Sequence, residues 1–170
     1  MPHVVSLAYK PADVERRPDS RFSRLPVGHV RLVAGHGIAG DTKGRSDSRQ
    51  LNVLLAETVE QLRAEGFRTA PGELGEQIVI AGLPADIAVP GARLRVGDSA
   101  VVELVYLRVP CGRFARIQGQ PKDAVRGRIG FMARVLRSGD VAVGAPVRVE
   151  APAEQEAAPG TSREAESELK

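Results

Sequence analysis

Val101-Val102-Glu103-Leu104-Val105-Tyr106-Leu107 is the stretch that decides the fold. It is rich in β-branched residues, which favour strands, and it is apolar on both faces, which indicates a central strand covered on each side. The expected strand spans residues 101–109 and ends at Pro110-Cys111-Gly112-Arg113, where proline and glycine interrupt regular structure. The only cysteine of the chain therefore follows the end of a central strand.

Short apolar stretches between turn signals predict further strands on both sides of this one. We expect them at residues 4–8, 27–33, 51–55, 78–80, 93–96, 131–136 and 145–149. Residues 10–23 and 35–41 predict loops, and Ser138-Gly139-Asp140 predicts a turn. Helical spacing of apolar residues marks one clear helix, at residues 57–65. The pattern predicts a mostly β (β-rich α+β) fold, a partly closed β-barrel of short strands with one or a few short helices.

The composition divides the chain into a body and a tail. Residues 151–170 contain five Glu against Arg163 and Lys170 and almost no large apolar side chain, so burial cannot offset their ordering entropy. We predict one domain at residues 1–150 and a disordered tail at residues 151–170. The body carries 22 basic and 16 acidic residues, a charge of +6, which suits an anionic partner such as a phosphate-bearing cofactor.

Several classes of protein are disfavoured by what the sequence contains. One cysteine excludes an intramolecular disulfide and a zinc site of several cysteines. No apolar run approaches the roughly 20 residues that span a bilayer, and no signal-peptide pattern opens the chain, so we expect a cytoplasmic protein without membrane contact. Two Tyr and four Phe are few for stacking bases, which makes nucleic acid an unfavoured partner.

Cys111 is a candidate for chemistry, although a free cysteine is usually a small buried hydrophobe. It follows a strand end, proline and glycine flank it, and Arg108, Arg113 and Arg116 are close in sequence. Positive charge stabilises thiolate, the form that attacks sulfur or binds a soft metal. A structural thiol remains the alternative.

Two further segments are candidates for a binding site. Gly37-Ile38-Ala39-Gly40-Asp41 offers backbone amides to an anion and Arg49 can bond phosphate, although most such segments are turns. Glu76 and Gln77 enter a short apolar strand, where they can hydrogen-bond a heteroaromatic ring or only stabilise a turn. His36 can bond an anion or simply occupy a turn, and three scattered histidines argue against zinc.

Taken in order, these segments resemble the MOSC domain, the C-terminal domain of molybdenum cofactor sulfurases. The resemblance covers about residues 27–149 and rests on G-I-x-G-D, R-Q-x-x-x-L, G-E-L-G-E-Q-I-x-I-x-G-L, G-x-R-L-x-V-G, R-x-P-C and G-R-x-G-x-x-A-R-V-L-x-x-G. Gln77 stands where the family usually has Asn. Similar domains occur as small stand-alone bacterial proteins and in the mitochondrial amidoxime-reducing component.

The resemblance implies a molybdenum–pterin cofactor and a role for Cys111 as molybdenum ligand or as persulfide sulfur carrier. The residues expected to contact the cofactor are Arg49, Gln50, Glu76, Gln77, Arg113 and His36. Pyridoxal phosphate belongs to another domain of the full sulfurases and is not expected in this chain.

Two chemistries fit this resemblance. One is reduction of a small N-hydroxylated or N-oxide compound, with electrons from a partner protein because the sequence has no flavin, haem or iron–sulfur motif. The other is sulfur transfer from a donor of the cysteine desulfurase type. The alternative to both is a non-catalytic basic β-barrel module that binds an anionic ligand or nucleic acid, with Cys111 structural.

Overall fold

The computed structural model describes residues 1–13 and 24–151. The predicted loop at residues 10–23 lies mostly outside the described residues, and so does nearly all of the predicted tail at residues 151–170. No helix in the described part is long and apolar enough to cross a membrane.

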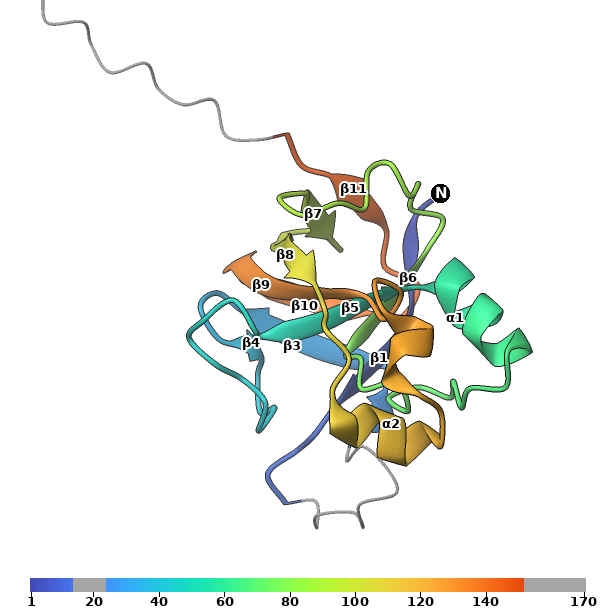
Figure 1. The fold of residues 1–170 in the computed structure, drawn as a ribbon. Helices are drawn as coiled ribbons and strands as arrows, with labels where there is room; N and C mark the ends of the chain where they lie inside the picture. Colours follow the sequence, from blue (N-terminus) through green and yellow to red (C-terminus); the bar gives the residue numbers. More distant parts are fainter. Residues whose placement is uncertain (14–23, 152–170) are drawn as a thin grey trace, which may run out of the picture.

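The described residues form a large mixed sheet, a small antiparallel sheet and short helices (Figure 1). The large sheet has the order β11-β7-β8-β9-β5-β6-β1-β2 and the small sheet β10-β3-β4. Bounds in the large sheet are β1 His3–Tyr9, β2 Leu25–Val27, β5 Leu51–Leu55, β6 Ile78–Ala81, β7 Arg93–Val96, β8 Ala100–Leu107, β9 Phe131–Arg137 and β11 Val147–Val149. The remaining elements are β3 His29–Val33, β4 Gly37–Ile38, β10 Gly139–Ala142, α1 Ala56–Ala64, α2 Gly112–Gln118 and the 3-10 helix η1 Lys122–Val125.

The two ends of the large sheet meet, which confirms the predicted partly closed barrel. The N–H of Val4 in β1 donates to the carbonyl of Ala145 at 2.9 Å, and the N–H of Gly144 donates to the carbonyl of Val4 at 2.7 Å. Residues 144–147 lead into β11 at one edge, whereas β1 lies beside β2 at the opposite edge. Backbone hydrogen bonds therefore join the two ends of the large sheet.

Alternating side chains of β5 and β6 fill two separate cores. Val53 and Ile78 pack inside the barrel, whereas Leu54 and Val79 pack outside it. The outer core also contains Leu62 of α1, so this helix covers the outer face. Since β5 and β6 are parallel, their connection must cross over the sheet, and α1 makes this crossover.

Three local predictions were wrong in detail. The strand predicted at residues 27–33 breaks at Gly28 into β2 and β3, which belong to different sheets. The predicted turn at Gly139 is instead the start of β10, which pairs with β3. Glycine is needed there because a Cβ would lie 2.5 Å from the hydroxyl oxygen of Ser99. The predicted loop at residues 35–41 contains the two-residue strand β4, which pairs with β3.

Candidate functional site

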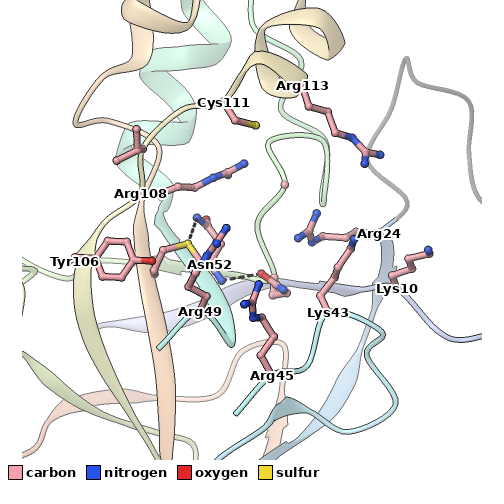
Figure 2. A pocket seen from close by; sticks show the side chains of 14 residues that line it. Lys10, Arg24, Lys43, Arg45, Arg49, Asn52, Tyr106, Arg108, Cys111 and Arg113 are labelled. Carbon is pink, nitrogen blue, oxygen red and sulfur yellow. Dashed lines mark hydrogen bonds between the residues drawn. The ribbon is translucent and has the colours of Figure 1, made fainter. Parts of the chain in front are cut away.

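A cavity of about 750 Å³ opens where β1 and β8 end and where β5 and β6 begin (Figure 2). Six separate parts of the chain line it, because the partly closed barrel brings these strand ends together. Its charged lining residues are all basic: Lys10, Arg24, Lys43, Arg45, Arg49, Arg108 and Arg113. The site is therefore a cationic cavity, and we use this name for it below.

Cys111 lies on the wall of the cationic cavity, immediately before α2. β8 ends at Leu107, and residues 108–111 form an irregular connection that carries the cysteine to the cavity. The cysteine is exposed, and Figure 2 shows its sulfur directed into the space between Arg108 and Arg113. The cavity thus combines one accessible thiol with a surrounding group of cations.

Arg108 is held in place by contacts on both sides of its guanidinium group. Its Nη1 donates to the carbonyl oxygen of Leu74 at 2.6 Å, and the guanidinium lies 5.7 Å from the ring centroid of Phe114. Burial lowers the pKa of Arg108 to about 10, and repulsion from Arg24 contributes, whereas attraction to Cys111 acts in the opposite direction. Arg108 is thus a fixed cation that interacts electrostatically with the thiol.

Asp41 organises the wall opposite β8. Its Oδ1 accepts the backbone N–H of Lys43 at 3.0 Å and that of Lys10 at 3.3 Å. Its Oδ2 accepts from Nε2 of Gln77 at 3.4 Å, and the aspartate is 5% exposed. The aspartate of the G-I-x-G-D segment therefore ties together two chain segments that each supply a cation.

The cations of the cavity are not fully neutralised by the protein. Arg45 pairs with Asp47 at 2.7 Å, whereas Lys10, Lys43 and Arg49 form no ion pair with any carboxylate in the described part of the chain. Partial burial lowers the pKa of Lys43, and repulsion from Arg24 lowers it further. The seven basic side chains, rather than the pKa of one lysine, make the cavity positively charged and suited to an anion.

A model of the MOSC domain family matches residues 40–148. The chain belongs to this family. No curated protein matches it in sequence. Among solved structures it resembles YiiM from Geobacillus stearothermophilus, with 23% identity, a TM-score of 0.67 and coverage of 89% of this chain and 76% of that one. It also resembles YuaD from Bacillus subtilis, with 18% identity, a TM-score of 0.67 and coverage of 86% and 94%. At these identities the two structures support the fold alone.

Four of the predicted site residues of this MOSC domain line the cationic cavity. They are Arg49, Gln77, Cys111 and Arg113, which come from three distant segments of the sequence. Gln77, which replaces the usual Asn of the family, bridges Asp41 and the backbone N–H of Asn52. That these residues contact a cofactor stays a prediction.

Gln50 and Glu76, two other predicted site residues, are buried and make structural hydrogen bonds. Gln50 Oε1 accepts the N–H of Val135 at 2.8 Å, which joins the start of β5 to β9. The Glu76 carboxylate accepts the N–H groups of Gly72 at 2.6 Å and Leu74 at 3.0 Å, and burial raises its pKa. Neither residue lines the cationic cavity, and their predicted contact with a cofactor is untested.

His36, the remaining predicted residue, packs against the loop that carries Lys43 and Arg45. Its ring occupies the space that a Cβ of Gly44 would need, and its carbonyl oxygen accepts the N–H of Arg45 at 2.9 Å. His36 does not line the cavity, but it contacts the loop that carries Lys43 and Arg45 to it. Its predicted role as a direct anion contact likewise stays a prediction.

Sequence reasoning missed several residues of the cavity as cofactor contacts, although it named Arg108 as a cation close to Cys111. Arg108 had a signal, because it begins the R-x-P-C segment, and Lys43 and Arg45 follow the G-I-x-G-D segment closely. Arg24 and Asn52 carried no such signal, because only the fold brings them to the cavity.

Proposed function

We propose that this MOSC domain binds a molybdenum cofactor, or a closely related anionic pterin, in the cationic cavity and uses Cys111 for its chemistry. The observation that carries the proposal is the arrangement of seven cations around one exposed cysteine in a single cavity.

The chemistry of the lining residues fits such a cofactor. A volume of about 750 Å³ lies within the ~300–1,000 Å³ range of small-molecule sites. Arginine suits a phosphate ester because it donates in bidentate fashion, and a thiolate is a soft ligand suited to a soft metal centre. The described residues contain no group of three or more His, Cys, Asp or Glu that could hold a metal. The cofactor itself would therefore supply the other ligands of the metal.

The residues of this chain have separable roles in the proposal. Arg49 and Lys43, which lack carboxylate partners in the described chain, hold the cofactor phosphate. Arg108 places its fixed positive charge beside the sulfur of Cys111. The bound cofactor supplies a redox-active metal.

Two reactions fit this arrangement. Reduction of an N-hydroxylated compound takes up two electrons and two protons and releases water, and a partner protein would supply the electrons. In sulfur transfer, the Cys111 thiolate attacks the outer sulfur of a donor persulfide, so that the donor S–S bond breaks and the donor leaves as a thiolate. Cys111 then carries the persulfide to an acceptor.

Metal and sulfur analysis tests the proposal. The wild-type chain and Cys111→Ser are expressed in a host that makes the cofactor, and molybdenum, bound pterin and persulfide are measured. We expect molybdenum or persulfide in the wild type, and loss of persulfide and of any molybdenum-dependent reduction in folded Cys111→Ser. A wild-type chain that contains none of the three but binds inorganic phosphate would support the alternative, a non-catalytic module for an anionic ligand.

A further inference from the structure

Asn52, the only asparagine of the chain, lies in the wall of the cationic cavity. Its backbone N–H donates to Oε1 of Gln77 at 2.7 Å. Its side-chain Nδ2 donates to the carbonyl oxygen of Ile129 at 3.4 Å and lies 3.9 Å from Sδ of Met132 (Figure 2). These contacts fix the amide in one orientation, because exchanging its nitrogen and oxygen would place two acceptors against each other at Ile129.

The other atom of this amide, Oδ1, is buried and has no hydrogen-bond partner in the described part of the chain. Asn52 as a whole is 3% exposed, so bulk water does not reach the oxygen in this arrangement. Buried polar atoms are nearly always hydrogen-bonded, and an exception calls for a ligand or an ordered water. The carbonyl oxygen of Asn52 therefore lacks one donor.

Apart from the Tyr106 hydroxyl and the Cys111 sulfur, which can also accept, the charged side chains of the cavity present donors to a ligand. The seven cations can only donate hydrogen bonds. Gln77, the other amide side chain in the described lining, is already used, since its Oε1 accepts from Asn52 and its Nε2 donates to Asp41. Met132 lines the wall beside Asn52, and its flexible unbranched side chain can move aside as a ring enters.

The surrounding cations favour the most ionised form of an inorganic anion, which brings acceptors and few or no donors to Oδ1 of Asn52. A nitrogen heterocycle with a ring N–H or an amino group supplies the missing donor. We propose that Asn52 is a specificity-determining residue that accepts a hydrogen bond from such a ring, so that the cavity selects phosphate-bearing heterocycles that carry a ring N–H or an amino group over simple anions. This inference rests on the proposed function and adds to it the part of the ligand that is recognised.

Carbon-13 NMR of the Asn52 side-chain carbonyl tests the hydrogen bond directly. Since the chain has one asparagine, selective labelling gives one signal. The probes are the phosphate ester of 6-hydroxymethylpterin, inorganic phosphate, and the same ester methylated at its ring N–H and amino group. We expect the unmodified ester to shift the signal and inorganic phosphate to leave it unchanged. Loss of the bond should weaken binding of the methylated ester about 2- to 13-fold.

Asn52→Leu provides the same test from the protein side, because leucine nearly preserves the volume but has no acceptor. We expect this variant to lose about 2- to 13-fold in affinity for the pterin ester and to keep the wild-type affinity for inorganic phosphate. Thermal melting checks that the variant folds, and if it does not, the methylated ester still tests the native chain. Guanosine monophosphate also carries a ring N–H and an amino group. Whichever of the two, the pterin ester or the nucleotide, binds more tightly identifies the class of ligand that the cavity recognises.

The outcomes separate this inference from the proposed function. One outcome is that the ester binds more tightly than inorganic phosphate while the Asn52 signal does not move and methylation has no effect. That result overturns the role of Asn52 but leaves the proposed function of the cavity standing. An ester that binds no more tightly than inorganic phosphate overturns both.

Discussion

Arg49→Ala should weaken ligand binding and leave the fold intact. The Arg49 side chain lines the cationic cavity and forms no ion pair with any described carboxylate, while its backbone N–H, which the mutation keeps, donates to Oδ1 of Asp47 at 2.9 Å. Truncation therefore leaves no buried partner unsatisfied, and the free energy of unfolding should change by no more than about 0.5 kcal/mol.

The expected loss of affinity follows from the bond that Arg49 would make to a phosphate. A hydrogen bond to a charged group contributes ~1.5–3 kcal/mol, which corresponds to about 10- to 150-fold in the dissociation constant. Calorimetric titration with the phosphate ester of 6-hydroxymethylpterin measures it. Ionic strength must be held constant, since long-range attraction is screened beyond ~8 Å at 0.15 M salt.

Arg126→Ala is the matched control, because it removes the same charge from an exposed residue of the chain outside the cavity. Arg126 pairs with Asp123 on the surface, at 2.6 Å, and does not line the cavity. Its removal should leave the affinity almost unchanged. Equal affinities of the two variants would refute the reasoning, because the cationic cavity would then attract the anion only through its total charge.

Three further predictions concern other residues of the site. Native Cys111 is exposed and should react readily with iodoacetamide, as measured by mass spectrometry, and bound ligand should protect it; a thiol that reacts only after unfolding would be structural. The pKa of Lys43, measured by NMR, should lie below the usual value of 10.5 and should rise when inorganic phosphate binds. Because the pKa of Lys43 is lowered in the folded state, the unfolded chain binds more protons at pH values between the folded and unfolded pKa. The free energy of unfolding should therefore rise with pH in that window. A urea midpoint that does not change with pH there would contradict this. Arg108→Ala leaves the carbonyl of Leu74 without its donor, so urea unfolding should show a loss of about 1–3 kcal/mol, and an unchanged midpoint would show that this contact is dispensable.

The sequence by itself determined most of the strands, the family and the position of the thiol. Alternating or continuous apolar residues mark strands because the side chains of a strand point to opposite faces with a period of two. The strand predicted at residues 101–109 is β8 in the centre of one sheet, and Cys111 follows its end. The segment R-x-P-C also placed Arg108 beside the thiol, because neighbours in sequence after a strand end remain neighbours in space.

The tertiary structure alone decided which distant residues meet and what each of them does. The split of residues 27–33 between two sheets and the meeting of residues 144–147 with β1 depend on register over long distances, which local patterns do not encode. Glu76 and Asn52 are both buried polar residues near the same strands, yet the carboxylate of Glu76 is satisfied by two backbone N–H groups while the carbonyl of Asn52 lacks a donor. Such a difference arises from packing around each side chain, because hydrogen bonds depend on the positions of atoms that the sequence brings together only through the fold.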